Sequence, residues 1–237
     1  MKEKAMISFV SPVYLSENSI TKLVEEIKKV MVEINKPFEI ILVDDRSPDN
    51  SWEVMKQLSF EYPEVKSIRL SRNFGQHPAI FAGLSEAVGD WVVVIDCDLQ
   101  DQPKEVVKLY NKAKEGFDIV LAKRKNRKDT FFKKMSSKLF SKVFSFFTDA
   151  QYDNEIANFG IYHSRVIDVV AKMREPMRAF PAMINWVGFK KGKLLVQHQA
   201  RYEGKSSYNW NRLINLALDI TVAYSDKPLK LTIKLGF

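Results

Sequence analysis

The chain has 237 residues, 46% of them apolar and 28% charged. This balance is ordinary for a soluble globular protein, and it excludes a disordered chain while allowing one large α/β domain with a sizeable core. The single cysteine excludes an internal disulfide and fits a reducing compartment. The first apolar run, residues 6–10, is too short for a signal peptide, and no run of about 18 apolar residues predicts a transmembrane helix.

The net charge of +8 indicates anionic partners, such as nucleic acid, phosphorylated ligands or an acidic membrane surface. Basic side chains concentrate between residues 123 and 142, where the one acidic side chain is Asp129. They are Lys123, Arg124, Lys125, Arg127, Lys128, Lys133, Lys134, Lys138 and Lys142. The segment is either a solvated helix face or a surface for anions, and its composition alone leaves both interpretations open.

Apolar runs closed by polar or turn residues predict strands at residues 6–13, 38–43, 65–70, 91–95 and 117–122. Apolar residues at helical spacing predict helices between them, at residues 16–34, 51–60, 78–88 and 103–114. We expect Ser16 or Asn18 to cap the first helix, and Asp49 or Asn50 the second. Strands alternating with helices predict the α/β fold class, with a mostly parallel sheet and helices on both faces.

Beyond residue 123 the pattern changes. Residues 131–147 predict an amphipathic helix with aromatic side chains on one face and basic or serine side chains on the other. Further strands are expected at residues 159–163 and 193–200, and an apolar helix at residues 209–224.

Polar clusters follow four of the predicted strands, at residues 14–17, 44–49, 71–76 and 96–101. Ligands of open parallel sheets bind beyond the carboxyl ends of the strands, where these clusters would meet. Their convergence on one edge is a stronger indication of a site than any one of them.

Asp96 and Asp98 come directly after the most apolar predicted strand, separated only by Cys97. In extended or turning backbone, positions two apart point the same way, and Gln100 continues this register. Two such carboxylates can hold a hard divalent cation, with waters and phosphates as its other ligands. The alternative is an ordinary turn. Cys97 is expected to point into the domain as a small packing residue.

The other clusters offer further polar groups. Asp45 is expected to contact a ligand, such as a ribose hydroxyl or a base N–H, whereas Asp49 is expected to cap a helix. Arg72 or Asn73 is either a diphosphate contact or a loop-ordering residue. His77 lies near the same edge and has the same two alternatives.

Four motifs, in order, are similar to those of the family 2 glycosyltransferases, which have the GT-A nucleotide-sugar-binding fold. They are SPVYLSE (11–17), VDDRSPD (43–49), LSRNFGQHPAIFAGLSEAVGD (70–90) and VIDCDLQDQP (94–103). Within that family the chain resembles the polyprenol-phosphate sugar transferases, the group that includes dolichol-phosphate mannose synthase. Weaker similarity continues through ANFGIYHSR (157–165) and RYEGKSSY (201–208). The resemblance implies a GT-A catalytic domain over residues 1–224.

The resemblance also implies roles for individual residues. Asp96 and Asp98 would bind Mg²⁺ or Mn²⁺ on the donor diphosphate, with Gln100 beside them. Residues expected to bind the nucleotide part of the donor are Pro12, Tyr14, Glu17, Asp44 and Asp45. Residues expected to contact phosphate charge, or to close over the diphosphate, are Asn73, Arg124, Arg127, Arg201, Lys205 and Ser206. These roles suit the reaction, because a departing diphosphate gains negative charge that a metal and guanidinium groups stabilise.

The chain departs from the family pattern at two positions. Many relatives have an aspartate, a candidate general base, where this chain has Asn158. An asparagine cannot take a proton at neutral pH. One alternative is that the acceptor needs no base, as with an ionised lipid phosphate. The other is that Asp153 or Glu155 serves as the base. Ser207 stands where the family often has lysine, and Lys205 or Arg212 is expected to replace that charge.

The acceptor expected from the resemblance is a polyprenyl phosphate. The basic and aromatic helix at residues 131–147 would lie on an anionic membrane surface, although an ordinary packing helix is the alternative. Residues 225–237 resemble the lead-in to C-terminal transmembrane helices of relatives. We therefore expect the protein at the cytoplasmic face of a membrane, anchored by such helices.

The leading hypothesis is inverting transfer of a sugar from a UDP- or GDP-type donor to this lipid. The first alternative is a glycosyltransferase that adds the sugar to a hydroxyl of a glycan or glycolipid, which would need a base. The second is a non-catalytic nucleotide-sugar-binding module. We expect no nucleic acid as partner, because no recognised nucleic-acid motif occurs. A homo-oligomer is left open.

Overall fold

The computed structural model describes residues 5–124, 156–173, 179–197 and 233. Within them the strands are β1 (Ile7–Val13), β2 (Phe38–Asp44), β3 (Val65–Arg69), β4 (Trp91–Val94), β5 (Ile119–Arg124), β6 (Ile156–His163) and β7 (Lys191–Val196). The helices are α1 (Ile20–Ile34), α2 (Ser51–Glu61), α3 (Gln76–Glu86), α4 (Glu105–Ala113), α6 (Ser164–Lys172) and α7 (Phe180–Trp186). None of the helices in these ranges is long and apolar enough to cross a bilayer.

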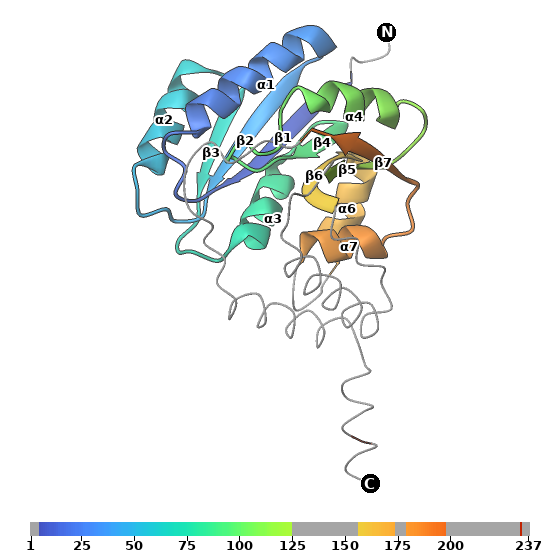
Figure 1. Ribbon diagram of the computed structural model, residues 1–237. Helices are drawn as coiled ribbons and strands as arrows, with labels where there is room; N and C mark the ends of the chain where they lie inside the picture. Colours follow the sequence, from blue (N-terminus) through green and yellow to red (C-terminus); the bar gives the residue numbers. More distant parts are fainter. Residues whose placement is uncertain (1–4, 125–155, 174–178, 198–232, 234–237) are drawn as a thin grey trace, which may run out of the picture.

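The strands form one sheet of seven in the order β3-β2-β1-β4-β6-β5-β7. All run in the same direction except β6, which pairs antiparallel with both β4 and β5 (Figure 1). The mostly parallel α/β sheet expected from the sequence is therefore confirmed. The one reversed strand lies between β4 and β5, and its pairing with β4 could not be foreseen from local pattern.

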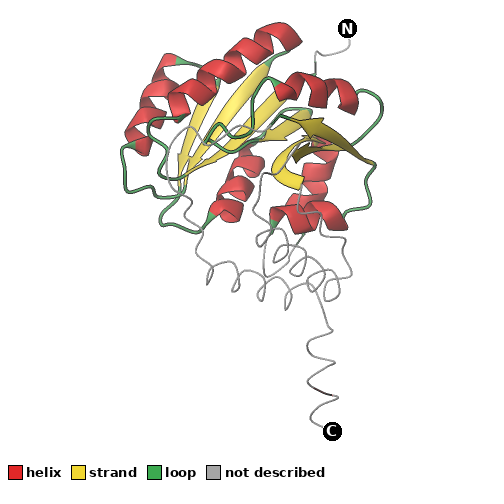
Figure 2. Cartoon of the chain, viewed as in Figure 1, coloured by secondary structure: helices red, strands yellow, loops and turns green. Residues whose placement is uncertain are grey.

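Helices cover both faces of the sheet (Figure 2). On one face α1, α2 and α4 pack in a core with Phe9 and Val93, and on the other α3, α6 and α7 pack in a core with Val10 and Val94. Successive strand residues thus point into different cores, as the two-residue period of a strand requires. Because helices cover both faces, β1 is buried along its whole length, and its sequence is a nearly continuous apolar run rather than an alternation of apolar and polar residues.

The expected elements up to residue 122 are all present, with ends shifted by a few residues. The expected cap of α1 is wrong, because the helix begins at Ile20 and its N-cap, Ser19, makes no side-chain cap bond. Ser16 and Asn18 lie in the loop before it, and the Ser16 carbonyl accepts the N–H groups of Ser19 and Ile20 at 3.0 and 3.3 Å. Of the two candidates for α2, Asn50 occupies the N-cap position without a side-chain cap bond, whereas Asp49, one residue before it, accepts the Ser51 N–H at 3.2 Å through Oδ1.

Helices α6 and α7 were not expected, whereas the strands predicted at 159–163 and 193–200 correspond to β6 and β7. The helices predicted at 131–147 and 209–224 lie outside the described residues, as do Asp153, Glu155 and nearly all of residues 225–237.

A buried carboxylate locks the amino end of the sheet, opposite the edge where ligands are expected. Glu39 of β2 accepts hydrogen bonds from Ser8 Oγ at 2.6 Å, from the Val88 N–H at 2.8 Å and from Lys66 Nζ at 2.7 Å. Burial raises the pKa of Glu39, but these three hydrogen bonds outweigh burial and hold the pKa below its ordinary value. Glu39 therefore ties three strands and the turn before β4 while ionised.

We expect Glu39→Gln to lower the free energy of unfolding by about 1–3 kcal/mol at pH 7, because an amide cannot accept all three donors. The depressed folded-state pKa means that the Glu39 contribution is present above the unfolded pKa and is lost as pH falls through the folded pKa. Urea unfolding from pH 7 to pH 3 should therefore show a smaller acid loss for the variant than for the unsubstituted protein. The exposed Glu33→Gln is the control, and equal acid losses in all three proteins would contradict the prediction.

Candidate active site

Loops from β1, β2, β3 and β4 meet at the carboxyl edge of the sheet, because these four strands are parallel neighbours. The convergence of the four polar clusters predicted from the sequence is confirmed.

The loops after β1 and β2 are joined by a row of hydrogen bonds. The Leu15 N–H donates to Ser47 Oγ at 2.7 Å, and the Glu17 N–H donates to Asp49 Oδ2 at 3.3 Å. In return the Asn50 N–H donates to Glu17 Oε2 at 2.8 Å. The two loops are consequently one structural unit, and Glu17, for which a donor contact is predicted, already orders it.

Asp44 and Asp45 end β2 and face different partners. Asp44 is fully buried, and its Oδ1 accepts the Ser47 N–H at 2.8 Å. Its Oδ2 forms an ion pair with Arg69, whose Nε lies 3.0 Å away, but the geometry is not that of a hydrogen bond. Asp45 accepts the Phe74 N–H at 2.7 Å and the Gly75 N–H at 2.8 Å, one on each oxygen. Asp45, for which we predicted a ligand contact, thus orders the loop after β3, and its contact with donor stays a prediction.

The Asp45 carboxylate lies at the amino end of α3, where a negative charge is favoured by the helix dipole. Burial raises the pKa of Asp45, the neighbouring Asp44 charge adds to this, and the two backbone N–H bonds only partly oppose it. The chain enters α3 through Gly75, whose φ of 99° suits glycine. The helix start is therefore set by one carboxylate from the neighbouring strand end.

The first turn of α3 also reaches the loop after β4. Gln76 Nε2 donates to Asp96 Oδ1 at 2.7 Å. The sequence placed Gln76 in a polar cluster but assigned it no role. Its position directly after Gly75, just before a helix predicted from residue 78, is the signal that could have identified it.

Asp96, Cys97 and Asp98 alternate in exposure, with both aspartates partly exposed and Cys97 buried at 6%. The prediction that Cys97 points inward is confirmed, and that the two carboxylates share one side stays a prediction. Cys97 belongs to the core on the α1 face, and its Sγ donates to Ser16 Oγ at 2.9 Å. Asp98 Oδ1 accepts the Gln100 N–H at 3.1 Å, so Gln100 orders the loop through its backbone.

Three of these loops contain a non-glycine residue with positive φ. They are Leu15 at 52°, Arg46 at 55° and Leu99 at 59°, one each after β1, β2 and β4. Each such conformation costs on the order of 1–2 kcal/mol. Strain of this kind concentrates at functional sites, and its occurrence after three neighbouring strands marks this edge as one.

The remaining residues predicted for this edge differ in how far they are exposed. Pro12 is buried within β1, whereas Tyr14 and Asn73 are exposed and open to a ligand. Burial lowers the pKa of His77 to about 4, so its imidazole is neutral near pH 7, and its buried Nδ1 has no hydrogen-bond partner within the described structure.

Asn158 comes to this edge through the reversed strand. The antiparallel register pairs Val94, the last residue of β4, with Gly160, and Asn158 lies two residues beyond Gly160 toward the edge where β4 ends. Arg124 ends β5, and nothing is described of its side chain. Four further predicted residues lie outside the described ranges: Arg127, Arg201, Lys205 and Ser206.

The arrangement can hold a divalent cation only in part. Within the described ranges no group of three or more His, Cys, Asp or Glu side chains comes together as a metal site. Asp96 and Asp98 therefore offer two carboxylates, and the remaining positions of a cation would fall to water and ligand oxygens, as is usual for Mg²⁺ with phosphates.

A model of the family described as glycosyl transferase family 2 matches residues 8–172. The chain is 35% identical to the uncharacterized glycosyltransferase YkcC of Bacillus subtilis (strain 168), over 98% of this chain and 72% of that protein. It is 34% identical to undecaprenyl-phosphate 4-deoxy-4-formamido-L-arabinose transferase of Proteus mirabilis (strain HI4320), over 97% of this chain and 71% of that protein.

Among solved structures, glucosyl-3-phosphoglycerate synthase from Mycobacterium tuberculosis, in complex with Mn²⁺, UDP and glucosyl-3-phosphoglycerate, matches with a TM-score of 0.62 at 13% identity. The match covers 92% of this chain and 78% of the synthase. The fold is thus that of the GT-A glycosyltransferases, as the motifs led us to expect. The chain belongs to glycosyl transferase family 2, and it is a glycosyltransferase.

Burial raises the pKa of the Cys97 thiol to about 12, and this is the only cysteine of the chain. Because the thiolate is the reactive form, we expect native protein at pH 8 to react with Ellman's reagent about a thousandfold more slowly than protein unfolded in guanidinium chloride. The release of thionitrobenzoate measures both rates. A native thiol that reacts at the unfolded rate would show that Cys97 does not point into the core.

Gln76→Leu removes the hydrogen bond to Asp96 and should lower turnover about ten- to hundredfold, since bonds to charged groups are among the stronger ones. Release of nucleoside diphosphate measures the effect, and a higher metal concentration for half-maximal rate is expected with it. The control is Gln57→Leu, because Gln57 makes a similar bond to Glu61 at 2.8 Å on the exposed face of α2. Equal rates for the two variants would refute a role for Gln76.

Proposed function

We propose that this glycosyltransferase moves a sugar from a nucleoside-diphosphate sugar, of UDP or GDP type, to a membrane polyprenyl phosphate. The observation that carries the proposal is the pair Asp96 and Asp98, both partly exposed in the loop after β4, with the buried Cys97 between them. They lie at the edge where the interlocked loops after β1 and β2 leave Tyr14 exposed. This is the place where a nucleotide and its diphosphate would bind in a parallel sheet.

Asp96 and Asp98 would hold Mg²⁺ or Mn²⁺, because two carboxylates on one side suit a hard cation that keeps phosphate oxygens as ligands. When bound, the cation would neutralise charge on the departing diphosphate. Gln76 holds Asp96 and the Gln100 N–H holds Asp98, so the two carboxylates are oriented by the chain itself. The related Mycobacterium tuberculosis synthase, crystallised with Mn²⁺ and UDP, supports this choice of cofactor.

The acceptor class follows from the side chain that β6 brings to this edge. Asn158 is a neutral amide and cannot remove a proton from a hydroxyl, whereas an ionised phosphate needs no base. The relative from Proteus mirabilis, named for transfer to undecaprenyl phosphate, supports the same acceptor class. Direct attack by that phosphate on the sugar would invert the anomeric carbon. The embedded lipid would bring this edge to a membrane, for which we propose the cytoplasmic face, with C-terminal transmembrane helices as the anchor.

The test is release of nucleoside diphosphate from UDP- and GDP-sugars with Mn²⁺ or Mg²⁺, with either undecaprenyl phosphate in detergent or a soluble saccharide as acceptor. We expect release with the lipid phosphate, and a product of inverted anomeric configuration by NMR. Release with the saccharide alone would refute the lipid acceptor and favour transfer to a hydroxyl.

Asp96→Asn and Asp98→Asn should each lower this rate about a hundredfold or more, because each removes one carboxylate from the proposed cation. The exposed Asp168→Asn on α6 is the matched control and should keep the full rate. Intact turnover in both site variants would show that the metal assignment is wrong.

A further inference from the structure

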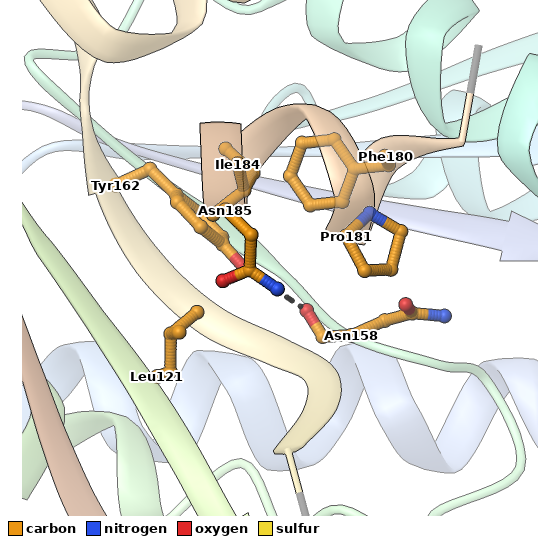
Figure 3. Close-up of a pocket in the computed structure, with 7 residues that line it drawn as sticks. All are labelled: Leu121, Asn158, Tyr162, Phe180, Pro181, Ile184 and Asn185. Atoms are coloured by element: carbon orange, nitrogen blue, oxygen red, sulfur yellow. Dashed lines mark hydrogen bonds between the residues drawn. The ribbon is translucent and has the colours of Figure 1, made fainter. Parts of the chain in front are cut away.

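A small hollow lies between β6 and α7, beside the candidate active site (Figure 3). It is lined by Leu121, Asn158, Tyr162, Phe180, Pro181, Ile184 and Asn185. The hollow has an empty volume of about 220 Å³, which includes the part that opens to solvent. Its enclosed part has room for a group about the size of one water molecule. Because Asn158 lies two residues beyond Gly160, the partner of Val94 at the end of β4, the hollow is at the same edge of the sheet as the loop that carries Asp96 and Asp98.

The lining contains no charged side chain among the described residues. Its polar groups are two carboxamides and a tyrosine hydroxyl, and its other walls are aliphatic, proline and phenylalanine side chains. A phosphate would find no cation among these groups, whereas a neutral hydroxyl would find both donors and acceptors. The chemistry of the hollow therefore fits an uncharged, hydroxyl-bearing group.

The backbone of Asn158 is held by a buried tyrosine. Asn158, Gly160 and Tyr162 share one face of β6, since they are two residues apart. The fully buried Tyr162 ring extends along the strand past Gly160, and its hydroxyl donates to the Asn158 carbonyl at 3.3 Å. A Cβ at Gly160 would lie 2.9 Å from that hydroxyl oxygen, so the glycine is what permits this path.

Helix α7, which forms the other wall of the hollow, is also held in place by side-chain contacts. Lys191 Nζ of β7 donates to the Asn185 carbonyl at 2.6 Å and fixes the end of α7. Phe180, at the start of α7, packs edge to face on Tyr162 and on Phe81, with ring centroids 5.2 and 6.0 Å apart. Both asparagines are thus positioned through their backbone carbonyls, and Figure 3 shows the Asn185 carboxamide directed into the hollow. A carboxamide held at the wall of a hollow in this way favours recognition over simple packing.

We propose that this hollow receives one hydroxyl or similarly small substituent of the sugar carried by the donor, and that Asn185 and Asn158 recognise it. The inference rests on the proposed function, because it assumes a nucleotide sugar at Asp96 and Asp98. Asn185 is then a residue that determines which sugar is transferred. A site built to hydrogen-bond a hydroxyl discriminates strongly against analogues that lack it, because its buried polar groups would be left unpaired.

The test compares binding of nucleotide sugars with binding of the bare nucleotides. Affinities for UDP-glucose, UDP-N-acetylglucosamine, GDP-mannose, UDP and GDP are measured by calorimetry with Mn²⁺ present. In Asn185→Leu, which has similar volume but no polar group, we expect affinity for the preferred nucleotide sugar to fall about tenfold. Affinity for the corresponding bare nucleotide should not change. Asn185→Ala should show the same selective loss and guards against a packing defect in the leucine variant.

The matched control is Asn111→Leu on the exposed face of α4, which should bind every ligand as the unsubstituted protein does. Equal loss for sugar nucleotide and bare nucleotide, or no loss, would overturn the inference. A raised KM for undecaprenyl phosphate with unchanged donor affinity would also overturn it, since the hollow would then belong to the acceptor. Unsubstituted protein that binds none of the sugar nucleotides would overturn the proposed function itself, which distinguishes the two failures.

Discussion

The first turn of α3 is the interaction on which the active edge depends. Asp45 at the end of β2 accepts the Phe74 and Gly75 N–H groups, and Gln76 one residue later donates to Asp96 after β4. One helix start therefore connects two strands that are not neighbours in the sheet, since β1 lies between them. Because the Asp45 bonds satisfy N–H groups at a helix start and place a carboxylate at the positive end of its dipole, this connection is stable without a ligand.

The loops at the carboxyl edge of the sheet are held in place by hydrogen bonds and carry several carboxylates close together. Loops held in positive-φ conformations after β1, β2 and β4 are locked by hydrogen bonds to one another, so their side chains have little freedom to rearrange. The same loops gather carboxylates, among them Asp44, Asp45, Asp96 and Asp98. Like charges at close quarters disfavour each other unless a cation or a donor intervenes. Arg69 and backbone N–H groups provide this for the first two, Gln76 and the Gln100 N–H provide donors for the last two, and the proposed divalent cation would add a positive charge beside them.

The two halves of the edge differ in charge. Strands β1, β2 and β4 contribute the acids, whereas β6 and α7 contribute neutral amides and rings around the hollow at Asn158 and Asn185. This division follows from the antiparallel placement of β6, which brings its amino end, rather than its carboxyl end, to the active edge. A metal-bound diphosphate and a neutral sugar would each meet the environment that suits its charge.

The sequence by itself determined the parallel α/β core and the edge that carries the site, because these depend on local periodicity and on the polar residues that follow each strand. The bond from Asp49 to the first N–H of α2 and the packing role of Cys97 were predictable for the same reason. The tertiary structure alone decided that β6 is inserted between β4 and β5, that Asp45 holds α3, and that Tyr162 reaches Asn158 past Gly160. These depend on contacts between residues distant in the chain or on exact side-chain paths, and neither propensity nor spacing encodes them, since pairing partners and side-chain orientations are selected only when the whole core packs.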